Sequence, residues 1–200
     1  MKQKDRITEE NIINAGTLIG FLFLFVKGII SITEGNPELI SDRFFEAGLF
    51  LLMFFFYKKL KLRIWTLAIA AFAIVLHHMY LYGTFYFGIP FDHIMHLVAG
   101  FAVCVIFYQI LLNSYKKPNL IGILLLSIIL AMGLTSGMET VEFIGYSFLG
   151  EGEGILYYGT GDFGEWNNMS WDLIDNTLGA IAGAIAYTSF IVIRKKFNSS

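Results

Sequence analysis

The chain has 200 residues, of which 56% are hydrophobic and only 15% are charged. Soluble domains carry about 25% charged residues, so too few charges remain here to cover a water-soluble globule. The composition also excludes a disordered chain, which needs low hydrophobicity. Cys104 is the only cysteine, which excludes an internal disulfide, and a net charge of −2 offers no basic surface for nucleic acid. We therefore expect an integral membrane protein surrounded by membrane lipids.

Six apolar segments have the length of membrane-spanning helices or approach it. A helix needs about 20 mostly apolar residues to cross a hydrocarbon core of about 30 Å. The segments are residues 12–31, 39–57, 64–83, 92–112, 120–149 and 171–193. The second segment reaches this length only if its helix starts at Asn36-Pro37, which is a typical helix start. The sequence thus predicts an all-α membrane protein with six transmembrane helices in one polytopic domain, residues 1–200.

The first segment has an alternative reading as a secretory signal peptide. Glu9 and Glu10 precede it, and no small-residue cleavage site follows it. Signal peptides have a basic region before the apolar stretch and a small-residue site after it. We therefore expect residues 12–31 to be a retained membrane anchor.

Basic residues predict the orientation of the chain, because cytoplasmic loops carry an excess of Lys and Arg. They lie at the N-terminus, in the second and fourth connections and at the C-terminus: Lys2, Lys4, Arg6; Lys58, Lys59, Lys61, Arg63; Lys116, Lys117; Arg194, Lys195, Lys196. Both termini should therefore be cytoplasmic. The glycine-rich connection 150–170 is then extracytoplasmic, and loops of this length often form lids or binding loops.

Polar residues of the last three segments converge at one depth, near the outer surface. They are Asp92, His96, Glu139, Glu142, Asp172, Asp175 and Asn176. Asp92 and His96 are four residues apart and share one helix face. At 1.5 Å per residue, Glu139 lies about 28 Å along its helix, near the outer boundary. Ionisable residues inside a membrane are functional candidates by default, because burying a charge there is costly.

This residue set suits a divalent metal ion. Glu139 and Glu142 share one face and repel each other unless a cation, a proton or a basic partner lies between them. One histidine with several carboxylates fits Zn, Mn or Mg better than copper. The expected metal or ligand residues are Asp92, His96, Glu139 and Asp172, supported by His77, Asp162, Asp175 and Asn176. Glu142 is the candidate general base on a metal-bound water.

Structural explanations compete with each of these functional ones. They are helix capping for Asp92 and Asp172, interhelical hydrogen bonding for Asp175 and Asn176, and packing for His77 and Cys104. Glu46 would pair with Lys27. Glycines four residues apart favour close helix packing, at Gly16/Gly20, Gly133/Gly137 and Gly179/Gly183. Packing of the last two pairs would bring Glu139 toward Asp172.

Three blocks of the sequence together resemble a known family. They are Phe91-Asp92-x-x-x-His96 with Gly100, Glu139-x-x-Glu142, and Gly161-Asp162 with Trp171-Asp172. In order and spacing they resemble the YjdF-type inner-membrane family, small bacterial multi-span proteins without an established activity. The block Asp172-x-x-x-Asn176-Thr-x-Gly179-Ala-x-x-Gly183 also resembles the ending of VanZ-like proteins, a group that includes a teicoplanin-resistance factor.

The resemblance covers about half of the chain, residues 80–190, and implies a cell-envelope protein in the plasma (inner) membrane of a bacterium. The chain departs from the YjdF pattern at residues 163–170, which separate the Gly-Asp and Trp-Asp pairs. This insertion leaves the role of Asp162 open. The resemblance implies no particular reaction.

Three functions remain open from the sequence. The first is a site at the extracytoplasmic face that binds a metal ion or the polar head group of a lipid-like ligand. The second is a metal-assisted enzyme that acts on a lipid or a polyprenyl-linked envelope precursor. The third is an accessory protein in which the polar cluster only packs helices together. The substrate, the metal and the oligomeric state do not follow from the sequence.

Overall fold

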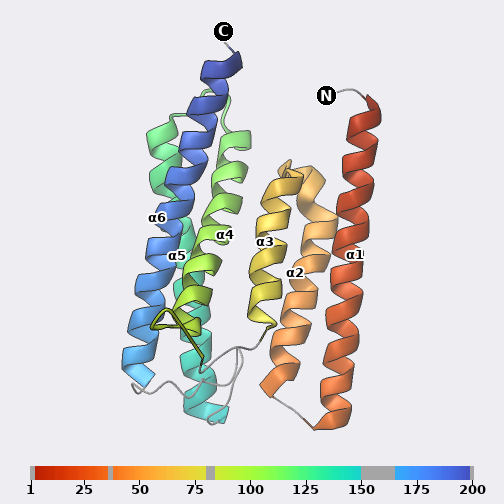
Figure 1. Ribbon diagram of the computed structural model, residues 1–200, viewed down its shortest axis with the longest axis vertical. Helices are drawn as coiled ribbons and strands as arrows, with labels where there is room; N and C mark the ends of the chain where they lie inside the picture. Colours follow the sequence, from red (N-terminus) through yellow and green to blue (C-terminus); the bar gives the residue numbers. More distant parts are fainter. Residues whose placement is uncertain (1–2, 36–37, 80–83, 150–164, 199–200) are drawn as a thin grey trace. The chain divides into compact units, whose positions relative to one another are not determined.

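The computed structural model describes residues 3–35, 38–79, 84–149 and 165–198 (Figure 1). Side chains at some helix ends also lie outside this description, at residues 3–7, 38, 39, 41, 142, 145–149, 165–168 and 198. The chain divides into two compact units. One comprises Met1–Ala71 and Thr140–Asp162, and the other comprises Phe72–Glu139 and Phe163–Ser200.

Each of the six apolar segments contains a helix. The helices are α1 (Gln3–Glu34), α2 (Glu38–Leu60), α3 (Ile64–His77), α4 (Phe91–Ser114), α5 (Leu120–Leu149) and α6 (Glu165–Asn198). Within the described residues, four stretches are long and apolar enough to cross a membrane: Thr8–Glu34, Phe91–Ser114, Leu120–Val141 and Met169–Phe197. The structure thus shows a nearly all-helical chain with four candidate spans. Six crossings and cytoplasmic termini stay predictions.

The helices in the second and third segments fall short for different reasons. α3 has 14 residues, whereas a span needs about 20. α2 carries Asp42, Arg43 and Glu46 inside its apolar stretch, and all three are buried. These side chains make α2 a helix of a protein core as much as a helix in lipid.

Two local structures differ from the sequence prediction. α6 begins at Glu165, so residues 165–170, expected in the long connection, are helical. Residues 165–170 contain no glycine or proline, so nothing in this stretch opposes extending the helix outward from Trp171. The connection before α4, for which the all-α prediction included no strand, contains the strands β1 (Phe85–Tyr86) and β2 (Ile89–Pro90).

In the first unit, α1 packs against α2 with side chains filling the interface. Ile13, Tyr57 and Leu67 form an apolar cluster. A Cβ atom added at Gly20 would lie 2.7 Å from the ring of Phe50, so this glycine makes room for an aromatic side chain. At Gly16, the other glycine of the predicted pair, no atom of the described residues lies within 4 Å of a Cβ position. Within the described residues, only Gly20 of this pair therefore allows close packing.

A buried arginine links the same two helices. Arg43 is 7% exposed, and its Nη1 donates to the backbone oxygen of Lys27 at 3.1 Å and to Oγ of Ser31. The predicted pairing of Lys27 with Glu46 stays a prediction. At the surface, Lys58 Nζ lies 2.8 Å from Oε2 of Glu10.

In the second unit, α4 and α6 approach each other backbone to backbone. A Cβ atom at Gly100 would lie 2.2 Å from the carbonyl oxygen of Asn176, and one at Gly179 would lie 2.0 Å from that of Leu97. At Gly183 the corresponding distance to the Phe101 oxygen is 2.8 Å. Only glycine allows this approach. The predicted Gly179/Gly183 contact is thus present.

The other predicted glycine pair in this unit makes no such contact. At Gly133 and Gly137, nothing among the described residues lies within 4 Å of a Cβ position, so the expectation that they mediate close packing was wrong for this part of the chain. Instead, α5 meets α4 where Cys104 Sγ donates to Ser127 Oγ at 3.6 Å. Cys104 is fully buried, in keeping with a packing residue.

Candidate metal-binding site

A histidine near the start of α4 is the centre of the polar cluster in the second unit. His96 Nε2 lies 3.4 Å from Oδ1 of Asp92, one helical turn earlier, and 3.4 Å from Oδ1 of Asp172 on α6. These three residues each offer one donor atom, and the three atoms lie within 4.8 Å of one another. One imidazole nitrogen thus faces two carboxylates from two different helices.

The other nitrogen of the same ring faces α5 and α6. His96 Nδ1 lies 3.3 Å from Oε1 of Glu139 and 3.1 Å from Nδ2 of Asn176. Nδ2 of Asn176 donates to Oε1 of Glu139 at 2.9 Å. Three helices therefore meet at one imidazole ring, with Asp92 and Asp172 on one side and Glu139 on the other.

The carboxylates at this point are withdrawn from solvent. Asp172 is 2% exposed and Glu139 is 4% exposed. Burying carboxylates is costly unless positive charge or hydrogen bonds compensate them. The sequence of α4, of α5 and of α6 before Arg194 contains no lysine or arginine. Within this three-helix bundle, the compensation must therefore come from a histidine, a bound cation, a hydrogen-bond donor such as Asn176, or a proton on a carboxylate.

The close approach of α4 and α6 explains the location of the cluster. Gly100 lies one turn after His96, and Gly179 lies one turn after Asp175. Because the two backbones nearly touch at these glycines, side chains one turn before them can meet directly. α4 also begins nearby, at Phe91, and its N-terminal end favours the negative charge of Asp92.

A second polar pair lies beside the cluster, and one of its two members, His93, was not among the predicted site residues. His93 Nδ1 is 2.5 Å from Oδ2 of Asp175, and the His93 ring makes an edge contact with Trp171 at 5.6 Å between centroids. Asp175, predicted as a supporting residue, therefore contacts His93, the residue that follows Asp92 in the sequence. The sequence signal was that each residue lies one or two helical turns before a glycine of the α4–α6 contact, His93 before Gly100 and Asp175 before Gly179.

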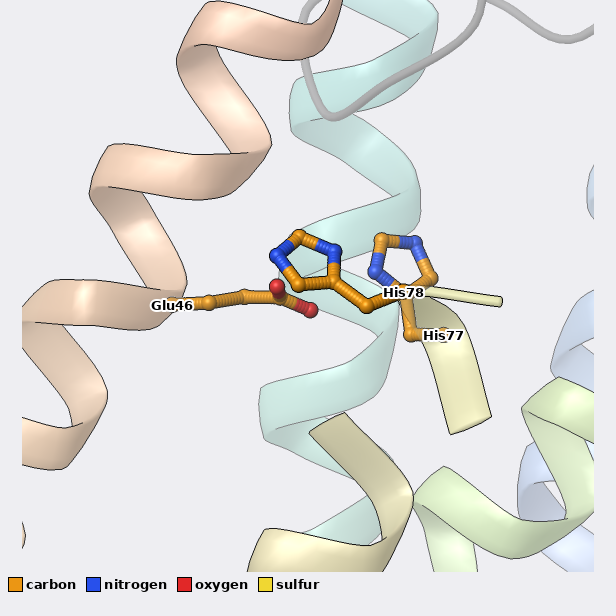
Figure 2. A group of neighbouring side chains, drawn as sticks. All are labelled: Glu46, His77 and His78. Atoms are coloured by element: carbon orange, nitrogen blue, oxygen red, sulfur yellow. The ribbon is translucent and has the colours of Figure 1, made fainter. Parts of the chain in front are cut away.

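The remaining predicted residues lie elsewhere or outside the described part. His77 ends α3, and its ring stacks on that of His78 at 6.3 Å between centroids. Figure 2 shows these two rings at the end of α3, and Glu46 on α2. The side chain of Glu142 and all of Asp162 lie outside the described residues.

Comparison with known proteins identifies the family. Neither the curated proteins nor the solved structures gave a match to this chain. A family sequence profile described as "Predicted membrane protein (DUF2238)" matches residues 15–193. This range includes every residue of the cluster around His96 and all four candidate spans in large part. The chain therefore belongs to the DUF2238 family of predicted membrane proteins.

Proposed function

We propose that this membrane protein binds a divalent metal ion between Asp92, His96 and Asp172. Two carboxylate oxygens and one imidazole nitrogen lie within 4.8 Å of one another and come from two helices that glycines hold together. This donor set suits Zn, Mn or Mg. Three protein ligands would leave coordination positions open for water or a ligand oxygen.

The two-sided placement of His96 carries the proposal. A histidine that binds a metal through one ring nitrogen usually donates its other N–H to a carboxylate, which fixes the ring and its tautomer. Here Nε2 faces Asp92 and Asp172, while Glu139 lies 3.3 Å from Nδ1. We therefore assign Glu139 to orienting the ring rather than to the metal. Asn176 in turn holds Glu139.

The place of the cluster supports an amphiphilic ligand. Asp92 lies in the first turn of the candidate span Phe91–Ser114, and Asp172 lies near the start of Met169–Phe197. A ligand there would have its polar head at the ion and an apolar tail in the bilayer. The proposal also places the site at the extracytoplasmic face of a bacterial plasma membrane. It includes a relationship of the chain to the YjdF-type and VanZ-like proteins. With Glu142 as general base, the same site would be a metal-assisted enzyme.

One observation favours a purely structural role instead. Asn176 is 2% exposed and contacts both His96 and Glu139, so it links α4, α5 and α6 without any ion. Interhelical hydrogen bonds of this kind stabilise membrane helix bundles. A packing cluster needs no metal, and this difference separates the two functions experimentally.

The test is the metal content of the protein purified in mild detergent, measured by mass spectrometry. We expect about one ion per chain in the wild type and loss of the ion in His96→Ala and Asp172→Asn. Glu34→Gln, which changes an exposed carboxylate of α1, is the matched control and should retain the ion. Circular dichroism checks that each variant is folded. A folded wild type without metal, even after addition of Zn, Mn or Mg, would leave only the structural role.

A further inference from the structure

The hairpin before α4 is tied directly to the start of that helix. β1 and β2 pair antiparallel, Phe85 with Pro90 and Tyr86 with Ile89. Phe87 and Gly88 form the two-residue loop, and the N–H of Phe91 donates to the carbonyl oxygen of Thr84 at 2.9 Å. The hairpin therefore continues directly into the first turn of α4 and is hydrogen-bonded to it (Figure 1).

The residue at the tip is unfavourable for the backbone conformation it adopts. Phe87 has φ of 55° and Gly88 has φ of 81°. Two-residue hairpin loops with two positive φ angles favour Asn-Gly, because asparagine tolerates the left-handed region. A bulky side chain there is a genuine outlier, and such strain persists mainly where function requires it.

The same residue is also unfavourable in water. Phe87 is completely exposed, Phe85 is 61% exposed and Ile89 is 51% exposed. Residues 84–91 contain no charged side chain. Backbone conformation and solvent thus both disfavour phenylalanine at this tip. The compensating contact must come from outside the described fold.

We propose that Phe85, Phe87 and Ile89 insert into the boundary between lipid head groups and acyl chains and anchor the start of α4. The hairpin is continuous with the candidate span Phe91–Ser114, whose side chains such as Leu97 are exposed to the surroundings. Aromatic residues are enriched at this depth of the membrane. Water and polar head groups there can form hydrogen bonds with the free backbone groups at the edges of the strands.

The anchor has a consequence for the polar cluster. Asp92 directly follows Phe91, so the depth of the hairpin sets the depth of the first turn of α4. Asp92 would lie at the head-group level, within reach of water and of charged lipid groups. The inference goes beyond the metal proposal and does not depend on it.

The test places a spin label at the tip of the full chain in vesicles of phosphatidylcholine and phosphatidylglycerol. Cys104, the single cysteine, is replaced by alanine, and labels are attached in Phe87→Cys, Leu125→Cys and Lys117→Cys variants. Leu125 is 55% exposed on the span of α5 and serves as the lipid control. Lys117, exposed between α4 and α5, is the water control. Collision with oxygen reports lipid, and collision with a water-soluble nickel chelate reports water.

We expect the Phe87 label to lie between the two controls, with nickel accessibility well below that of the Lys117 label and oxygen accessibility well above it. High nickel accessibility would place the tip in water and overturn the proposal. Low accessibility to both reagents would show that another segment or a second copy of the chain covers the tip, which also overturns it. Should Cys104→Ala not fold, Phe87→Trp in the otherwise native chain replaces the label. Its added fluorescence should be quenched by brominated lipids beyond the quenching of the parent protein, and no added quenching would reject the anchor.

Discussion

The α1–α2 pair and the α4–α6 pair solve the same packing problem differently. In α1–α2, glycines make room for aromatic rings, as Gly20 does for Phe50. In α4–α6, glycines face backbone, as Gly179 faces the oxygen of Leu97. A ring in the gap keeps two helices apart and fills the interface, whereas backbone contact lets short polar side chains one turn away meet.

The buried charges of the two pairs differ accordingly. In the first pair, the buried Asp42 and Glu46 share α2 with a buried cation, Arg43, which donates to a backbone oxygen and to Ser31 on α1. In the second, His96 is surrounded by the carboxylates of Asp92, Asp172 and Glu139, so acceptors exceed donors. A buried arginine with hydrogen-bond acceptors suits a structural link between two helices. An excess of carboxylates suits the binding of a cation. The following experiments separate the structural role of the first pair from the cation-binding role of the second.

The largest expected effect comes from disrupting the α4–α6 contact. Gly179→Ala adds a Cβ atom 2.0 Å from the oxygen of Leu97, so the two backbones must move apart. We expect the free energy of unfolding to fall by about 3 kcal/mol or more and the metal ion to be lost. Gly133→Ala, where nothing lies within 4 Å, should leave both unchanged. Chemical denaturation and metal analysis measure the two effects, and equal stability of the two variants would contradict the close approach.

A smaller effect, on stability alone, is expected from the α1–α2 pair. Arg43→Ala removes buried charge-assisted hydrogen bonds and should lower the free energy of unfolding by about 1.5–3 kcal/mol. Metal content should stay at the wild-type value. The exposed Arg63 provides a control of the same chemistry, Arg63→Ala, with little expected change in stability. Loss of metal in Arg43→Ala would show that the two roles are not separate.

Next comes the orienting carboxylate of the cluster. Glu139→Gln keeps the size of the side chain but weakens its hold on the His96 ring. Substitutions of residues that orient metal ligands cost about 10–100-fold in metal affinity, and we expect a loss in this range. Asp175→Asn should leave the affinity unchanged, since Asp175 binds His93. Titration calorimetry measures both, and an unchanged affinity in Glu139→Gln would reject its assigned role.

The smallest effect is expected at the surface of the first unit. The hydrogen bond from Lys58 to Glu10 raises the pKa of the Lys58 ammonium above its usual 10.5. The contribution of a raised pKa is fully present below the unfolded value and is lost only as the pH rises through the folded value. Because this ion pair is exposed and such pairs contribute little, Lys58→Met should leave the melting temperature nearly unchanged. Because the contribution is constant below the unfolded pKa, no new pH dependence is expected between pH 6 and 9. A clear drop in melting temperature would make this surface pair more than a minor contact.

Much of the cluster could be predicted from the sequence, because a helix has a fixed rise per residue and a fixed period. The apolar segments located the six helices, and the rise placed Asp92, His96, Glu139 and Asp172 at one level. The four residues do meet within one unit. Membership of a membrane protein family agrees with the composition. The number of crossings depends on the two helices whose polarity or length is marginal, α2 and α3.

The rotation of each helix about its axis could not be predicted from the sequence, because many rotations satisfy the same apolar pattern. Backbone contact at Gly100 and Gly179 selects one rotation of α4 against α6, while Gly133 and Gly137 take no part. That selection pairs His93 with Asp175 and directs opposite nitrogens of His96 toward different carboxylates. Composition and periodicity therefore determine which residues share a depth in this protein, and only the packing of helix against helix decides which of them touch.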